Sequence, residues 1–185
     1  MTVKIGILPI GQIDTALLLL LKEKLKEVIP DIAHIAICAR LSIPDKSLDK
    51  RRMQYRSDVI LSKIQFYADK RKNLNSVLGV VDVDIFVPEL NFVFGEATCP
   101  GKAALISLWR LKPEFYGALS NRELFAERVL KEAVHELGHT FGLKHCERTF
   151  CVMHFSNSIF DTDRKHLTFC DDCYMQLVLS INGLE

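Results

Sequence analysis

The chain has 185 residues, 49% of them apolar and 25% charged, as expected for one globular domain with its own core. With 24 Lys and Arg against 23 Asp and Glu, the net charge of +1 argues against a nucleic-acid or membrane partner recruited by bulk charge. The apolar run Leu17–Leu21 is far shorter than the ~20 residues of a membrane span, and the first ten residues lack a secretory-signal pattern. We therefore expect a cytoplasmic monomer, whose six cysteines are reduced thiols or metal ligands.

The first ninety residues alternate apolar runs with amphipathic segments. The predicted strands are Val3–Ile10, Ile32–Leu41 and Val77–Val87, and the predicted helices are Thr15–Ile29, with Asp14 as its cap, and Val59–Lys72. The polar segment 44–58 is expected to be a loop. Asp82 and Asp84 alternate with apolar residues, which favours a half-buried strand over a metal site.

The next segment, 92–111, predicts two strands joined around residues 99–101. The order βαβαβ followed by a hairpin predicts an α/β (α+β) fold, in which helices cover a mixed, twisted sheet. We expect a single domain, 1–185, with a sheet and helix subdomain over 1–142 and an irregular C-terminal subdomain over 143–185 that ends in a helix.

A long helix is predicted from a capping box at Ser120 and Glu123 to about Phe141. Its core positions share one face and are Ala126, Leu130, Ala133 and Leu137. His135 and His139 lie on roughly the opposite face, so we expect them to point toward an open surface. Regular periodicity stops after Gly142 and resumes in a final helix from Asp171 or Asp172 to about Asn182.

The stretch 135-HELGHTFGLKH-145 carries the strongest chemical signal. His135 and His139 are one helical turn apart, so both imidazoles reach one metal ion, and Glu136 lies beside that ion as a candidate base. Gly142 can adopt positive φ and reverse the chain, which brings His145 back as a third ligand. Three imidazoles leave a fourth zinc position open, and an open position is typical of a catalytic site.

Three functions are compatible with this site. The first is a zinc metallopeptidase, the second a zinc hydrolase of a non-peptide amide or ester, and the third a non-catalytic two-zinc protein that binds peptides or partners. Glu136 argues against the third, because a structural zinc site requires no base.

The motif H-E-x-x-H-x-x-G-x-x-H resembles the metzincin clan of zinc peptidases. Met153 matches the methionine that lies beneath the metal in that clan, whereas Phe155 stands where some members carry a tyrosine. Four cysteines follow the third histidine, at Cys146, Cys151, Cys170 and Cys173, and they narrow the resemblance to the archaemetzincins, over residues 135–173. This resemblance implies a compact metzincin-like domain with a catalytic zinc and a second, structural zinc held by four cysteines.

The cysteine spacing also predicts the second site independently. Cys146 and Cys151 form one pair and Cys170 and Cys173 another, each with a spacing typical of zinc sites. The alternatives are two disulfides, or buried thiols that only pack. A zinc ion held by these four thiolates would tie the irregular 143–170 segment to the last helix.

The expected substrate is a peptide or an unfolded segment, paired with a strand edge within 92–108, where Gly95 and Gly101 permit close approach. Cys99 is expected near the substrate cleft and Cys38 in the core. His154 and His166 follow the motif in sequence, and we expect them on the surface.

Overall fold

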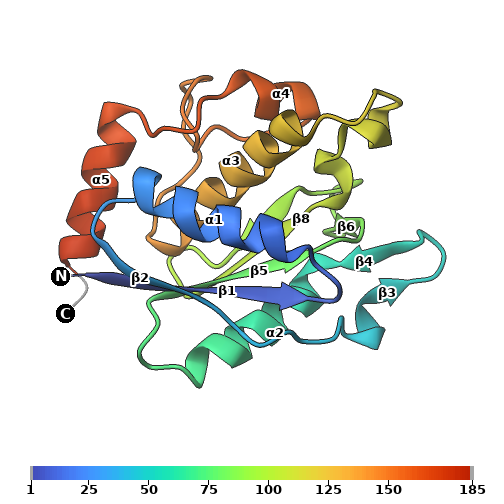
Figure 1. Cartoon of the computed structure of the whole chain (residues 1–185), viewed down its shortest axis with the longest axis horizontal. Helices are drawn as coiled ribbons and strands as arrows, with labels where there is room; N and C mark the ends of the chain where they lie inside the picture. The colour runs from blue at the N-terminus through green and yellow to red at the C-terminus, as the bar shows by residue number, and fades with distance from the viewer. Residues whose placement is uncertain (1, 184–185) are drawn as a thin grey trace.

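The structure, a computed structural model, describes residues 2–183 and is built around a five-stranded sheet (Figure 1). The strands in spatial order are β2 (Ile32–Ile37), β1 (Val3–Ile10), β5 (Ser76–Val81), β8 (Ala103–Ser107) and β7 (Gly95–Ala97). The first four are parallel, and β7 pairs antiparallel to β8 at the edge. The predicted mixed α/β sheet and the hairpin around residues 99–101 are confirmed.

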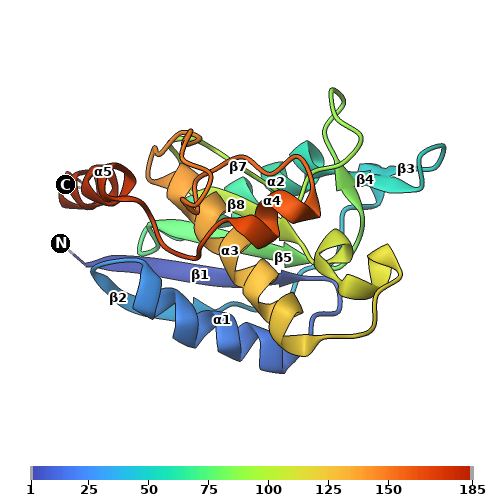
Figure 2. The same cartoon turned by 90° about the horizontal axis from the view of Figure 1, so that it is seen from above.

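Helices cover both faces of this sheet. The helices α1 (Thr15–Val28) and α3 (Arg122–Thr140) lie on one face, and α2 (Ser57–Asp69) lies on the other (Figures 1 and 2). The alternation of side chains along β1 explains the two layers, because Ile5 and Ile7 join the core beneath α1 and α3 while Leu8 and Ile10 pack toward α2.

The start of α3 differs from the prediction. Its cap is Asn121, whose side chain accepts a hydrogen bond from the Leu124 amide at 3.0 Å. Asn121 has the extended backbone of a cap residue, so Ser120 lies one residue too early. The capping box predicted from Ser120 and Glu123 is therefore wrong, whereas Asp14 caps α1 as predicted.

The segment 44–58 is not simply a loop, which corrects a second prediction. It contains a short 3₁₀ helix (Asp45–Ser47) and the strands β3 (Leu48–Asp49) and β4 (Gln54–Arg56), and β4 pairs with β6 (Ile85–Phe86). The predicted strand Val77–Val87 is thus two strands in two sheets, and β2 ends at Ile37 instead of Leu41.

Long-range polar contacts explain this small sheet. Arg52 donates to the carbonyl oxygen of Asn91 at 2.8 Å, and its guanidinium lies 3.8 Å from the centre of the Phe86 ring. Asp84 and Asp82 form ion pairs with Arg110 and Lys112 at 2.7 and 2.6 Å, so neither is part of a metal site. Two further 3₁₀ helices, Trp109–Leu111 and Pro113–Tyr116, lead from β8 toward α3.

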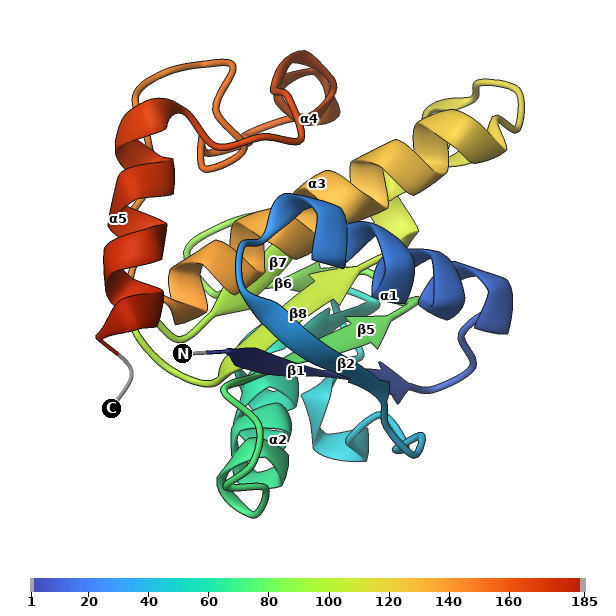
Figure 3. The ribbon, with the colours of Figure 1, turned by 60° about the vertical axis from the view of Figure 1, so that its left-hand side comes forward.

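After α3 the chain is largely irregular, as predicted, apart from α4 (Ile159–Arg164). The final helix, α5 (Asp171–Asn182), lies beside the C-terminal end of α3 (Figure 3), where Ser180 donates to the Phe141 carbonyl oxygen. Among residues 2–183, no helix is long and apolar enough to cross a membrane.

Candidate active site

The C-terminal half of α3 positions two histidines on one side of the helix. The Nε2 atoms of His135 and His139 lie 3.1 Å apart. Two imidazole nitrogens on one tetrahedral zinc ion, each at ~2.0–2.1 Å, would lie ~3.3 Å apart. The helical spacing alone therefore brings both nitrogens close to the separation that zinc requires.

Backbone carbonyls fix the orientation of these two rings. His135 Nδ1 lies 2.8 Å from the Val152 carbonyl oxygen, and His139 Nδ1 lies 2.7 Å from that of Leu143. A carbonyl oxygen only accepts, so each Nδ1 carries the proton and each Nε2 keeps a free lone pair. Burial holds the pKa of His135 well below its ordinary value, which also favours the neutral, ligating form.

The third histidine arrives through a tight turn. Gly142 has φ of +89°, and its amide donates to the His139 carbonyl oxygen at 2.8 Å, so the helix ends and the chain reverses there. The nitrogen atoms offered by His135, His139 and His145 then lie within 4.8 Å of one another. The donor set and its spacing fit one zinc ion.

Met153 lies directly beneath the histidine helix. It is fully buried, and a Cβ added to Gly138 would lie 2.5 Å from the Met153 Sδ atom. Gly138 is thus required for the approach of the methionine between His135 and His139. The sequence motif predicts Met153 at this position, but it does not indicate that residue 138 must be glycine.

Glu136 faces the edge strand of the sheet. A Cβ at Gly95, on β7, would lie 2.5 Å from Glu136 Oε1, so this strand can pass over the carboxylate only with a glycine there. Burial, together with the neighbouring Glu132 carboxylate, raises the pKa of Glu136 well above its ordinary value. A raised pKa makes the carboxylate a better proton acceptor.

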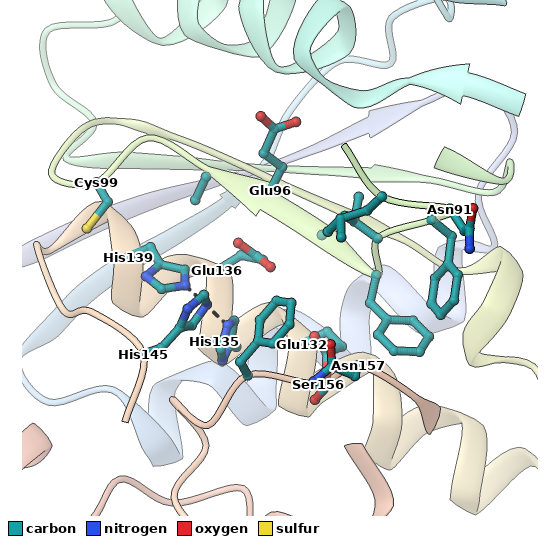
Figure 4. A pocket seen from close by; sticks show the side chains of 17 residues that line it. Asn91, Glu96, Cys99, Glu132, His135, Glu136, His139, His145, Ser156 and Asn157 are labelled. Atoms are coloured by element: carbon teal, nitrogen blue, oxygen red, sulfur yellow. Dashed lines mark hydrogen bonds between the residues drawn. The ribbon is translucent and has the colours of Figure 1, made fainter. Parts of the chain in front are cut away.

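These groups open into a cleft of about 470 Å³ between β7 and α3 (Figure 4). Its walls are the segment 90–97, the histidine face of α3 and the segment 155–157. Cys99 also lines it, as expected, whereas His154, His166 and Gly101 do not. Gly101 instead packs against the Thr98 side chain in the hairpin turn.

The open surface predicted for His135 and His139 is wrong for His135, whereas His139 is half-buried and lines the cleft. His135 is 4% exposed and Glu136 5%, because the segment that contains Val152 and Met153 covers this side of α3. Helical periodicity separates the two faces of α3 but does not show that both are buried. The residues that the sequence analysis missed include Glu132, Ser156 and the buried Lys165, none of which belongs to a recognised motif.

The four remaining cysteines form a second cluster. Every Sγ atom of Cys146, Cys151, Cys170 and Cys173 lies within 4.8 Å of the others, and Cys146 and Cys170 are separated by 3.8 Å. A disulfide would require ~2.05 Å, whereas two sulfurs on one tetrahedral zinc, each at ~2.3 Å, lie ~3.8 Å apart. The spacing and the free thiols fit a four-cysteine zinc site and exclude the disulfide alternative.

The histidine and cysteine clusters are connected through the backbone around Cys146. The Cys146 amide donates to the Met153 carbonyl oxygen at 2.9 Å, and His154 Nδ1 lies 2.9 Å from the Cys146 carbonyl oxygen. Cys146 directly follows His145 in the chain. A ligand of the histidine cluster is therefore fixed by the cysteine cluster and by the turn around Met153. His154 supports this turn.

Comparisons with known proteins agree with this geometry. The profile of Peptidase family M54 matches residues 16–178. An archaemetzincin of Methanocaldococcus jannaschii is 44% identical over 177 residues, which cover 96% of this chain and 94% of that protein. An archaemetzincin of Pyrococcus abyssi is 42% identical over 174 residues and covers 92% of each chain.

Solved structures show the same fold. The crystal structure of an archaemetzincin from Methanopyrus kandleri superposes with a TM-score of 0.84 at 34% identity, over 98% of this chain and 96% of that one. The archaemetzincin of Archaeoglobus fulgidus, complexed with malonate, gives 0.78 at 36% identity, over 94% and 99%. The two metal-binding clusters fit the two zinc ions of the archaemetzincins. The chain therefore belongs to Peptidase family M54, the archaemetzincins, and is a zinc metallopeptidase.

Proposed function

We propose that Glu136 is the general base of peptide-bond hydrolysis at the histidine cluster, where His135, His139 and His145 hold the catalytic zinc. The observation that carries this proposal is the convergence of three imidazoles beside a buried carboxylate in the cleft between β7 and α3. A zinc ion held in this way supplies a Lewis acid that polarises the scissile carbonyl and acidifies water.

Glu136 transfers the proton in this reaction, and backbone carbonyls maintain the tautomers of His135 and His139. Glu136, whose pKa is raised by burial, accepts a proton from the attacking water and delivers it to the leaving amine. The carbonyl acceptors at Val152 and Leu143 keep His135 and His139 in the tautomer that binds metal throughout this cycle. Phe155 has no hydroxyl, so it cannot donate a hydrogen bond to the substrate.

The edge strand β7 gives the substrate a backbone to pair with. It is the last strand of its sheet, so its outer edge is free of strand partners among the described residues, and Gly95 leaves room over Glu136. An extended peptide or unfolded segment can hydrogen-bond along this edge while its scissile bond lies over the histidines. This arrangement favours a peptide over a non-peptide amide.

We further propose that Cys146, Cys151, Cys170 and Cys173 hold the structural zinc, and that residues 143–185 form a subdomain that this zinc attaches to residues 1–142. Gly142 and Met153 have supporting roles, as the turn between the two subdomains and as the packing beneath the metal helix. Four thiolate ligands also favour a reducing compartment, which agrees with a cytoplasmic location.

Cleavage of a broad peptide library by the zinc-loaded protein and by Glu136→Gln tests this proposal. We expect the variant to retain both zinc ions and to lose at least ~100-fold in kcat/KM, because general-base catalysis contributes ~10²–10⁴. Glu123→Gln removes the same charge from the exposed first turn of α3 and should cleave at the wild-type rate. Equal cleavage by Glu136→Gln, with its zinc retained, would refute the assignment of the base.

A further inference from the structure

We propose that Glu132 makes this peptidase selective for substrates with a basic side chain, arginine or lysine, next to the scissile bond; this inference rests on the function proposed above. Glu132 lies one helical turn before Glu136 on α3 and lines the cleft. Figure 4 shows it with Ser156 and Asn157 beyond His135, at the opposite end of the histidine row from Cys99. These three residues form the polar end of the cleft.

The Glu132 carboxylate is held in place from behind. Its Oε1 atom lies 2.9 Å from the Nζ of the fully buried Lys165 and accepts a hydrogen bond from Thr162 Oγ1 at 3.0 Å. Both contacts fall on Oε1, and Glu132 is among the residues that line the cleft. The side chain is 2% exposed, so it cannot swing into solvent. Glu132 is thus a fixed hydrogen-bond acceptor. A ligand that binds it loses little free energy to the ordering of this side chain.

Ser156 provides an independent sign of a ligand. Its Oγ atom is buried and has no hydrogen-bond partner among the described residues, although it belongs to the wall of the cleft. A buried hydroxyl without a partner is unfavourable and rare in native structures, so its retention requires an explanation. A polar group of the substrate that enters this end would supply the missing partner.

The charge of the cleft selects the sign of that group. Among the described residues, no lysine or arginine lines the cleft, whereas three glutamates do. The carboxylate of Glu96 points away from the histidines (Figure 4), so Glu132 and Glu136 are the acidic groups that the substrate meets. Lys165 lies behind Glu132 and outside the lining, so it offers no donor to the substrate. At the polar end, where the Glu132 carboxylate lines the cleft, a cationic side chain is therefore favoured over an anionic one.

The aromatic walls of the cleft determine which shape of substrate side chain fits. Phe92 and Phe94 line the cleft with their rings at 5.2 Å in an edge arrangement, and Phe155, 37% exposed, closes the other side. Aromatic faces accommodate the aliphatic stem of lysine or the planar guanidinium of arginine. An apolar body with a cationic tip matches apolar walls that lead to a fixed carboxylate.

Matched peptides test the proposal. Two peptides differ only at the residue next to the scissile bond, where one carries arginine and the other citrulline, which has the same shape without the charge. We expect the zinc-loaded wild type to prefer arginine by about tenfold or more in kcat/KM, the scale of one charge-assisted hydrogen bond. Glu132→Gln should reduce this ratio to near one. Glu123→Gln, on the exposed part of the same helix, should leave it unchanged.

Two further measurements keep the test decisive if Glu132→Gln folds poorly because Lys165 loses its partner. Ser156→Ala, which removes a hydroxyl without a protein partner, should fold normally and lower the arginine preference severalfold. The Glu136→Gln protein, which binds without cleaving, should bind the arginine peptide about tenfold more tightly than the citrulline peptide. Cleavage of both peptides at equal rates by the wild type would overturn the selectivity proposal alone, whereas cleavage of no peptide would overturn the proposed function.

Discussion

The two metal-binding clusters are adjacent in the chain, yet they are built in opposite ways. His135 and His139 project from a 19-residue helix, and backbone carbonyls orient their rings. Cys146 and Cys151 lie in an irregular segment, and Cys170 and Cys173 lie at the first turn of α5. The helix and its carbonyl contacts thus hold the histidine cluster in place, whereas the cysteine cluster holds the irregular segment around it in place. Loss of metal should have different consequences at the two sites.

Removal of a cysteine ligand should have the largest effect on the fold. Cys173→Ala should lose the structural zinc ion and the order of residues 143–170, because structural zinc contributes ~10–16 kcal/mol in small zinc domains. Since His145 lies in that segment, zinc binding at the histidine cluster should weaken as well. Zinc content and hydrogen exchange by mass spectrometry measure both changes. Cys38→Ala, which removes a thiol outside the cluster, should retain two zinc ions and full protection. Two zinc ions and wild-type protection in Cys173→Ala would show that the cysteines do not organise the segment.

The buried ion pair between Lys165 and Glu132 ties the end of α4 to α3, so its disruption should have the second largest effect. Lys165→Met leaves a carboxylate that is 2% exposed without its cation and should lower the free energy of unfolding by ~3–5 kcal/mol. Denaturant titration measures the change. The exposed pair of Lys24 and Glu27 is the matched control, since Lys24→Met should cost at most ~0.5–1 kcal/mol. Equal losses in both variants would contradict a structural role of the buried pair.

Removal of a histidine ligand should abolish activity while it leaves the fold intact. His139→Ala should lose one zinc ion and the ~2–3 kcal/mol that a ligand at ~100 times its dissociation constant adds to stability. Hydrogen-exchange protection over residues 143–170 should stay at the wild-type level. Collapse of that segment in His139→Ala would eliminate the distinction between the two clusters.

The smallest predicted effect concerns the helix that carries the histidines. Asn121→Ala removes the side-chain cap of α3 and should cost ~1 kcal/mol of unfolding free energy. Ser120→Ala should change the stability by less than ~0.5 kcal/mol, because Ser120 is not the cap. Thermal or chemical unfolding of the two variants gives the comparison, and the reverse order would restore Ser120 as the cap.

The histidine cluster could be predicted from the sequence because local geometry determines most of it. The spacing of His135 and His139 along a helix places their rings together, and the positive φ available to Gly142 directs His145 back toward them. The main strands were predictable for the same reason, since the continuous apolar run of β1 reflects burial on both faces of the sheet.

The remaining features depend on partners that are distant in sequence. Segment 44–58 looks like a loop because its arginines are polar, but Arg52 reaches the carbonyl oxygen of Asn91, 39 residues away. Glu132 and Lys165 pair across two elements, and neither belongs to a motif. The burial of His135 depends on a later segment that covers α3. Periodicity within one element cannot report such contacts.

A chelator titration of the zinc-loaded protein tests the central claim most directly. Zinc content, peptide cleavage and hydrogen exchange over residues 143–170 are followed in the same samples. We predict that cleavage disappears with the loss of the first zinc ion while the segment remains protected, and that protection disappears only with the second. Loss of protection before or together with the loss of cleavage would contradict the assignment of one zinc to catalysis and the other to the fold.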